Sequence, residues 1–181
     1  MGYGKESMKL HLGCGKNYIK GWVNIDLDSK IADKRMDLTK RLPYYKNTVS
    51  HIYSEHFIEH ISYDHFSKLL AECYRVLTPE GLIRISTPNL RYVVDCYIRN
   101  KTDEWKDQGW VSETSCKMMN DCFYRWGHKH IYDFEELRAC LVKAGFVEIK
   151  FCAWKQSEHP EFFNIESRHF HQELIVEGIK R

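Results

Sequence analysis

Two short apolar runs joined by a glycine-containing turn open this chain, in the stretch LHLGCGKNYIKGWVNIDLD. The first run, residues 9–12, is predicted to form a strand that ends at the glycine pair Gly13 and Gly15. Glycine adopts backbone torsions that other residues avoid and lets the main chain pass close to a ligand, although an ordinary loop turn also explains such a pair. The pattern is typical of an α/β sheet, whose ligands bind beyond the carboxyl ends of its strands.

An acidic residue follows the second predicted strand, residues 22–25. Asp26 stands at its tip, with Asp28 as a weaker rival, and a carboxylate there can accept hydrogen bonds from both vicinal hydroxyls of a ribose. NAD fits poorly, because the dinucleotide fingerprint needs a third glycine where the chain has Tyr18, and its acid lies about 20 residues further on. The stretch therefore favours a different cofactor that carries a ribose.

Strands and helices are predicted to alternate through most of the chain. A third strand over residues 49–53 precedes a helix over 63–77, whose apolar residues recur at helical spacing behind the capping residue Ser62. Residues 78–81, TPEG, are expected to break the chain before a strand over 82–86. This alternation predicts a layered α/β sheet.

The C-terminal part continues the same plan. Asp133 and Glu136 form a capping box for a helix that runs to Ala144 and stops at Gly145. Residues 146–152 and 173–178 are predicted to be two closing strands that pair antiparallel across the intervening loop.

Two regions depart from this plan, residues 91–129 and 156–170. The first is long, aromatic, rich in cysteine and weakly periodic, and it is expected to hold one or two helices that cover the open end of the sheet. We expect both regions to determine substrate specificity, because they lie where ligands of open α/β sheets bind. Four aromatic residues of the first region either stack on an acceptor or form the core of the covering segment: Trp105, Trp110, Tyr124 and Trp126.

Composition narrows the class of protein. The 181 residues carry a net charge of only +2 with acids and bases mixed, which gives no support for nucleic acid as a partner. Seven cysteines without a C-x-x-C pair indicate free thiols in a reducing compartment rather than a disulfide framework. The N-terminus lacks the apolar core of a signal peptide and no stretch is long enough to span a membrane, so a cytoplasmic location is expected.

Four motifs resemble those of class I S-adenosylmethionine-dependent methyltransferases: LHLGCG at 10–15, VNID at 23–26, IYSEHFIEH at 52–60 and RVLTPEGLIRIS at 75–86. The likeness covers about residues 8–90, and DFEELRACLVKAGF at 133–146 resembles the closing helix and strand. More narrowly, the chain is similar to small methyltransferases of the type 11 kind, whose first helix is abbreviated. The resemblance implies one α/β domain over 1–181, a Rossmann-like three-layer sandwich with a mostly parallel seven-stranded sheet, an antiparallel final strand and a covering insertion at 91–129.

The resemblance also implies a set of cofactor-binding residues. By this resemblance, Gly13, Cys14 and Gly15 lie along the methionine part of S-adenosylmethionine, and Asp26, with Leu27, holds the ribose. Asp37 and Leu38 lie near the adenine, and Ser54 and Glu55, at the end of the fourth strand, lie beside the reacting methyl group. The chain departs from the family at His11 and Asn17, and at Lys16, which either pairs with the methionine carboxylate or is solvated.

Histidines near the fourth strand are the natural proton acceptors, because their unperturbed pKa lies near neutrality. His60 matches a family position that often faces the site, and His56 lies one helical turn earlier. His128 and His130 precede the closing helix and can reach over the cofactor; His130 is the third candidate catalytic residue. His169 and His171 are expected in a surface loop.

A metal is a weaker alternative at the same place. His56, Glu59 and His60 have a spacing that permits metal binding on a helix, and resemble the Glu-x-x-Glu-His motif of some metal-dependent O-methyltransferases. A polar first turn explains the three residues as well, and no metal is expected.

The predicted function is methyl transfer from S-adenosylmethionine to an oxygen or nitrogen of a small-molecule or glycan acceptor, with S-adenosylhomocysteine as the product. Two alternatives stay open: a catalytically silent module that binds the cofactor and acts through a partner, and a nucleic-acid methyltransferase, which is the less expected of the two on charge.

Overall fold

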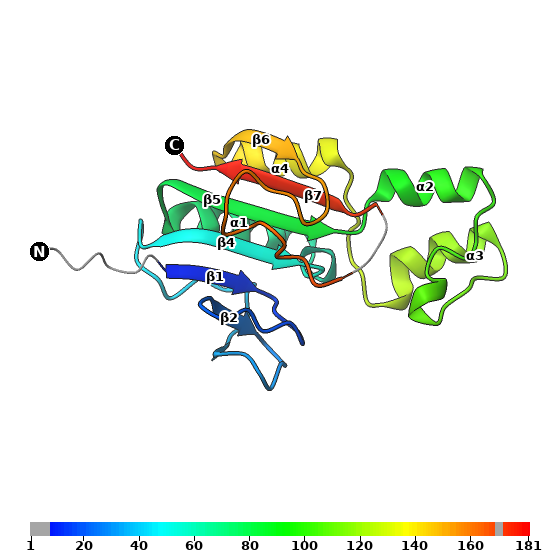
Figure 1. Cartoon of the computed structure of the whole chain (residues 1–181), viewed down its shortest axis with the longest axis horizontal. Helices are drawn as coiled ribbons and strands as arrows, with labels where there is room; N and C mark the ends of the chain where they lie inside the picture. The colour runs from blue at the N-terminus through cyan, green and yellow to red at the C-terminus, as the bar shows by residue number, and fades with distance from the viewer. Residues whose placement is uncertain (1–7, 169–171) are drawn as a thin grey trace, which may run out of the picture.

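A single twisted sheet organises the protein (Figure 1), and the computed structural model describes residues 8–168 and 172–181. The order of its seven strands is β3-β2-β1-β4-β5-β7-β6. Their bounds are Met8–Leu12 for β1, Val23–Asp26 for β2, Lys34–Arg35 for β3, Val49–Glu55 for β4, Leu77–Thr87 for β5, Val147–Phe151 for β6 and Leu174–Ile179 for β7. Strands β1 to β5 pair in parallel, whereas β7 runs antiparallel between β5 and β6, so the mostly parallel sheet with an antiparallel last strand is confirmed.

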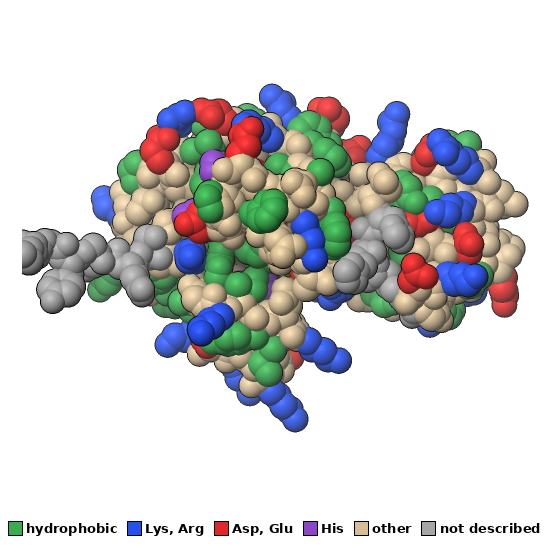
Figure 2. Space-filling view, in the orientation of Figure 1, with side chains coloured by type: hydrophobic (Ala, Val, Ile, Leu, Met, Phe, Trp, Pro, Cys, Tyr) green, Lys and Arg blue, Asp and Glu red, His purple; other side chains and the backbone are tan. Residues whose placement is uncertain are grey.

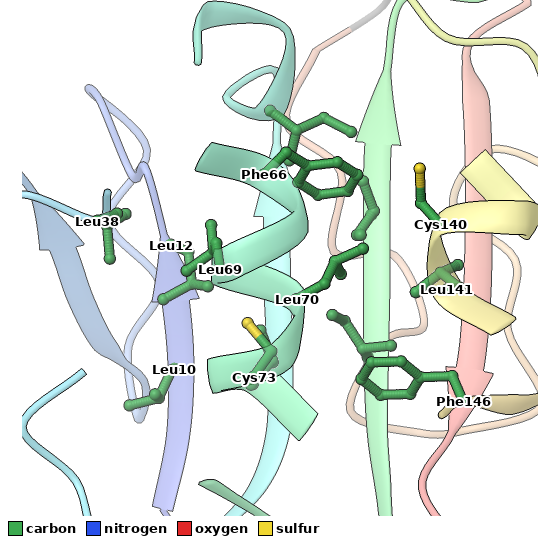
Figure 3. Packing of buried hydrophobic residues seen from close by; sticks show 14 of the residues in the cluster. Leu10, Leu12, Leu38, Phe66, Leu69, Leu70, Cys73, Cys140, Leu141 and Phe146 are labelled. Carbon is green, nitrogen blue, oxygen red and sulfur yellow. The ribbon is translucent and has the colours of Figure 1, made fainter. Parts of the chain in front are cut away.

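Two helices cover one face of this sheet (Figure 3): α1, Tyr63–Val76, and α4, Phe134–Ala144. Their apolar faces pack on strand residues that alternate inward, and the main core contains Leu10, Leu12, Phe66, Leu70 and Leu141. The predicted caps are confirmed, since the Ser62 hydroxyl accepts a hydrogen bond from the His65 amide at 3.3 Å and the Asp133 carboxylate accepts one from the Glu136 amide at 2.9 Å.

The opposite face is covered by irregular chain (Figure 1), so the third layer of the sandwich is the segment of residues 152–168. Phe162 of this segment packs with Trp22, Tyr53 and Leu82 of the sheet face. The segment also has a polar anchor, because the fully buried Arg84 of β5 lies 2.6 Å from the Glu166 carboxylate. Apolar packing and a buried ion pair therefore hold this covering segment on the sheet.

The insertion forms a small lobe beyond the carboxyl end of β5 (Figure 1). It contains α2, Leu90–Ile98, a 3-10 turn at Lys106–Gln108, and α3, Ser115–Asn120, which continues as a π-helical turn over Asp121–Arg125. The lobe has its own small core, made of Val93, Cys96, Met118, Cys122 and Ile131. The predicted helices are present, and they lie at the end of the sheet where strands β1 to β5 finish.

The break expected at residues 78–81 is wrong, because β5 begins at Leu77 and includes them. The Glu80 amide donates to the Lys180 carbonyl at 2.7 Å, and the Lys180 amide donates to the Gly81 carbonyl at 2.9 Å. These bonds to the far end of the chain draw the turn-forming residues into the sheet, where the strain is taken up by Glu80, with a φ of 62°, and by a register shift against β4.

Two further observations concern the chain as a whole. Each of the seven cysteines is a free thiol, and Cys14, Cys73, Cys96, Cys122 and Cys140 are buried. Over residues 8–168 and 172–181, every helix is too short or too polar to cross a bilayer.

Candidate functional site

A cavity of about 750 Å³ lies at the carboxyl ends of β1, β2 and β4. Eight of the nine predicted cofactor residues line it: Gly13, Cys14, Gly15, Asp26, Leu27, Asp37, Leu38 and Glu55. The ninth, Ser54, points to the helix-covered side, is buried, and makes no hydrogen bond to any residue that the structure describes. The residues predicted from separate stretches of sequence are therefore brought together around one space, apart from Ser54.

The turn after β1 requires glycine at one position in particular. The amides of Gly13 and Cys14 both donate to the Ile25 carbonyl, at 2.8 and 3.0 Å, and this draws the turn tightly against β2. Gly13 has a φ of 69°, and a Cβ there would lie 2.3 Å from the ring of Phe57. Gly15 also has a positive φ of 53°, but a Cβ there would meet open space. The first glycine thus permits close packing, and the second lies where the cavity is open.

Asp26 shapes this turn as well as lining the cavity. Its carboxylate accepts hydrogen bonds from the backbone amides of Gly15, Asp28 and Ser29, each at 2.9 Å. Burial alone would raise the pKa of Asp26, but these three amides outweigh it and hold the pKa below its ordinary value. Asp26 is therefore a pre-oriented anion at the rim of the cavity.

The far wall of the cavity combines an acid with apolar side chains. Oδ1 of Asp37 accepts from the Thr39 amide at 2.9 Å and from the Thr39 hydroxyl at 2.6 Å, and these bonds lower the pKa of the carboxyl. Leu38 is buried, whereas Leu27, which also lines the cavity, is half-exposed. A carboxylate flanked by two leucines suits a flat, partly apolar ring that carries an amino group.

Glu55 has a positioning role that the sequence did not show. Its two carboxylate oxygens accept hydrogen bonds from the backbone amides of Ser167 and Arg168, from the Ser167 hydroxyl and from the Asn17 side chain. Glu55 thereby ties the end of the covering segment to the turn after β1, and all four residues line the cavity.

A second cavity, of about 320 Å³, lies between the insertion and the ends of β4 and β5. Its walls include three aromatic side chains of the insertion, Tyr92, Trp105 and Trp126, and two carboxylates, Glu104 and Glu173. His56, His60 and Arg168 line both cavities, so the two spaces meet at these residues.

His56 is held between two buried carboxylates. Its Nε2 lies 2.7 Å from Oε1 of Glu173, and its Nδ1 lies 3.2 Å from Oε1 of Glu59. Burial would lower the pKa of His56, but the bonds to Glu173 and Glu59 raise it to about 9. An imidazolium donates protons at neutral pH, which argues against His56 as a proton acceptor. His56 and His60 do not lie on a common helix, because only Ile58–His60 forms a 3-10 turn there.

His60 faces His128 at the junction of the cavities, with ring centroids 4.9 Å apart. Nδ1 of His128 lies 2.6 Å from the Cys122 carbonyl, which only accepts, so this nitrogen carries the hydrogen and Nε2 keeps its lone pair. Burial lowers the pKa of His128 and favours the neutral ring.

His130 does not line either cavity, contrary to the prediction that it reaches over the cofactor. Its ring packs against Tyr63 and Tyr132 instead. The amides of Lys129 and His130 both donate to the Glu59 carbonyl, and this attachment leaves His128 as the histidine of this stretch that reaches the site. The predicted loop histidines His169 and His171 lie outside the described residues.

The chain was compared with known protein families and with curated protein sequences. Residues 10–85 match the family model described as a methyltransferase domain. This part of the chain is therefore similar to methyltransferase domains. No curated protein sequence matches the chain.

Solved structures share the fold of this chain beyond the matched residues. A SAM-dependent methyltransferase from Archaeoglobus fulgidus has a TM-score of 0.60 at 17% identity, over 96% of this chain and 86% of its own. A Thermotoga maritima SAM-dependent methyltransferase, a possible histamine N-methyltransferase, gives 0.62 at 18% identity, over 96% and 82%. Phosphoethanolamine N-methyltransferase 2 from Haemonchus contortus, in complex with S-adenosyl-L-methionine, gives 0.54 at 16% identity, over 88% and 36%.

Two features of the site are not evident from the sequence. Glu59, taken as a polar turn residue or a ligand on a helix, is fully buried, with Oε1 3.9 Å from Nε2 of His60. Arg168 reaches both cavities from a segment without periodic pattern. The sequence offered one hint of the role of Glu59. A glutamate that follows an apolar residue and lies between histidines is costly to bury without partners, so its burial implies that partners lie nearby.

Proposed function

We propose that the protein is a methyltransferase, which binds S-adenosylmethionine in the larger cavity and transfers its methyl group to an oxygen or nitrogen of a small acceptor held in the smaller one. The observation that carries the proposal is the meeting of the two cavities at His56 and His60. In-line methyl transfer requires cofactor and acceptor to approach from opposite sides of one point, and two adjoining spaces provide that arrangement. We further propose that the chain works as one domain with the insertion as its acceptor cover.

The residues around the larger cavity suit the parts of that cofactor. Gly15 lies at an open stretch of the turn, where backbone can approach the methionine part. Asp26, an oriented anion with lone pairs to spare, suits the ribose hydroxyls. Asp37 with Leu27 and Leu38 suits the adenine, since the carboxylate can accept from the ring amino group while the leucines cover its faces. When bound, S-adenosylmethionine supplies the electrophilic methyl group.

The protein's own part in the reaction is to orient the acceptor and to take its proton. His60 stands at the junction, is partly open to solvent, and is supported by the His128 ring 4.9 Å away. We assign the proton acceptance to His60, because an imidazole near the reacting atom suits that role. His56 instead supplies a positive charge between Glu59 and Glu173.

The smaller cavity suits a sugar or a small metabolite. Tyr92, Trp105 and Trp126 offer flat faces for stacking on a ring, and Glu104 and Glu173 offer acceptors for hydroxyl or amino hydrogens. Its volume of about 320 Å³ is in the range of small-molecule sites. On the face shown in Figure 2, Lys and Arg side chains are interspersed with Asp and Glu, which favours a small acceptor over nucleic acid. The free thiols suit a reducing compartment such as the cytoplasm.

Thermal unfolding with S-adenosylhomocysteine, beside NAD and a ligand-free control, tests the cofactor assignment. At about a hundred times its dissociation constant the ligand should add roughly 2.7 kcal/mol to the free energy of unfolding, which raises Tm by about 5 to 10 °C in a chain of this size. A rise in Tm with NAD alone, or no rise in Tm with either ligand, would reject the cofactor assignment. Binding without methyl transfer to any acceptor, unchanged in His60→Ala, would favour the silent module.

A further inference from the structure

We propose that Glu59, His60 and His128 form a binding site for a divalent transition-metal cation where the two cavities meet. One ligand atom from each of the three residues lies within 4.8 Å of the other two. Binding of the cation does not rest on the proposed function, because it depends only on these side chains. The trio differs from the helix-spaced set considered from sequence, since His128 replaces His56.

The geometry is that of an open site before it contracts onto an ion. Oε1 of Glu59 lies 3.9 Å from Nε2 of His60. Ligands of a tetrahedral ion with bonds of about 2.0–2.1 Å lie roughly 3.4 Å apart, so a small side-chain rotation suffices. His60 is free to make it, because its side chain is 37% exposed.

Glu59 is buried beside His60. Its side chain is fully buried, and Oε2 accepts a hydrogen bond from the Thr87 hydroxyl at 3.0 Å. Oε1 faces Nδ1 of His56 at 3.2 Å and Nε2 of His60 at 3.9 Å. His56 offsets part of the cost of burying this carboxylate oxygen, and a cation bound to a further lone pair of Oε1 would offset more of it.

His128 is oriented as metal-binding histidines are. Such residues commonly donate one ring N–H to a backbone carbonyl, which fixes the ring and turns the other nitrogen to the ion. Nδ1 of His128 makes this bond to the Cys122 carbonyl at 2.6 Å. The Lys129 amide donates to the Glu59 carbonyl at 2.7 Å, so the backbone holds His128 beside the carboxylate even without an ion.

His56 is not a fourth ligand, because each of its ring nitrogens faces a carboxylate oxygen, of Glu59 and of Glu173. Three protein ligands leave at least one coordination position open toward the cavities, as in catalytic rather than structural metal sites. Two imidazoles and one carboxylate favour Zn²⁺, Co²⁺, Ni²⁺ or Fe²⁺ over Mg²⁺ and Ca²⁺. If the proposed function holds, the ion would take over the task assigned to His60, because a His60 that binds the ion cannot also accept the proton; an acceptor hydroxyl bound to the ion would lose its proton more readily, to water in the open cavity.

Titration of the chelator-treated, tag-free full chain with Co²⁺ and Zn²⁺ tests this site, with the visible spectrum of Co²⁺ and calorimetry for Zn²⁺ as readouts. We expect one equivalent to bind, and His60→Ala and His128→Ala each to weaken binding at least tenfold. His130→Ala is the matched control, since this neighbouring histidine lies outside both cavities and should leave the affinity unchanged.

Circular dichroism and thermal unfolding of each variant establish that it is folded. Failure of the wild type to bind either ion below millimolar concentration would overturn the proposal, as would binding that survives both His60→Ala and His128→Ala. A Tm rise with S-adenosylhomocysteine in chelator, without metal binding, would reject the metal site alone. Metal binding without that rise would reject the cofactor assignment alone.

Discussion

Glu55 holds Ser167 by two hydrogen bonds, although the residues are 112 positions apart: Oε1 accepts from the Ser167 amide at 2.9 Å and Oε2 from its hydroxyl at 2.6 Å. The covering segment is thereby fastened to the end of β4, at the rim of the larger cavity. An acid that resemblance places beside the reacting methyl thus has a second task, because it closes one wall of the proposed cofactor site.

Glu55→Gln tests this task. The amide loses the charge and part of the acceptor capacity, so the free energy of unfolding should fall by about 1.5–3 kcal/mol in urea denaturation. Affinity for S-adenosylhomocysteine should fall as well, because Ser167 and Arg168 line the cavity. Glu113→Gln, at an exposed position of the insertion, is the control and should change neither quantity. Equal stability of the two variants would show that the hydrogen bonds of Glu55 to Ser167 and Arg168 contribute nothing to the free energy of unfolding.

The raised pKa of His56, about 9, predicts a dependence of stability on pH. The folded-state pKa exceeds the unfolded value of about 6.5, so the stabilising contribution is complete below about 6.5 and is lost as pH rises through about 9. The loss should be on the order of 3 kcal/mol in metal-free protein.

Glu173→Gln separates this effect from other titrations, because Glu173 is the partner of His56 Nε2. Its free energy of unfolding should vary less between pH 6.5 and 9.5 than that of the wild type, and the His56 ring should titrate at lower pH by NMR. Identical pH profiles would contradict the assignment of His56 as a buried imidazolium.

Much of the cofactor cavity could be predicted because its residues stand next to strand ends. Gly13, Asp26 and Asp37 each follow a short apolar or extended run, and parallel strands bring their carboxyl ends to one edge of the sheet. The pairing of His60 with His128 could not be predicted in this way. It depends on a hydrogen bond between the Lys129 amide and the Glu59 carbonyl, and no periodic pattern of the insertion reports such a contact.

Gly13→Ala should destabilise the protein more than Gly21→Ala. Both glycines have a positive φ, of 69° and 83°, so both substitutions carry the backbone strain of the left-handed region. Only at Gly13 does the new methyl group also collide with Phe57, at 2.3 Å. We expect Gly13→Ala to cost about 1–3 kcal/mol more in urea denaturation. An equal loss in the two variants would show that the turn relaxes freely away from Phe57.

Arg84→Met should be among the most destabilising substitutions on the sheet. Arg84 is fully buried and pairs with the carboxylates of Glu166 and Glu177, so its removal leaves two buried acids without a cation. The expected loss in free energy of unfolding is about 3–5 kcal/mol. Arg181→Met removes an exposed arginine that also pairs with two acids, and should cost at most about 1 kcal/mol. A loss of at most about 1 kcal/mol for Arg84→Met as well would contradict the role of the Arg84–Glu166 ion pair in holding the covering segment.

Arg84 also shows where sequence patterns mislead. It stands inside the apolar run LIRIS, where alternation alone suggests a side chain open to solvent on one face of the sheet. The face is instead covered by the segment that carries Glu166, 82 residues later, and the ion pair makes its burial possible. Irregular chain of this kind has no periodicity, so neither the covering layer nor the Arg84–Glu166 ion pair that holds it could be predicted from the sequence.

Titration of ¹⁵N-labelled protein with S-adenosylhomocysteine, followed by amide NMR shifts, tests whether the larger cavity is the cofactor site. We expect saturable shifts that concentrate at Gly13 to Gly15, Leu27 to Asp28 and Met36 to Thr39, the stretches that line the larger cavity, and little change in α4. The absence of saturable shifts, or their concentration away from these stretches, would contradict this assignment of the cavity.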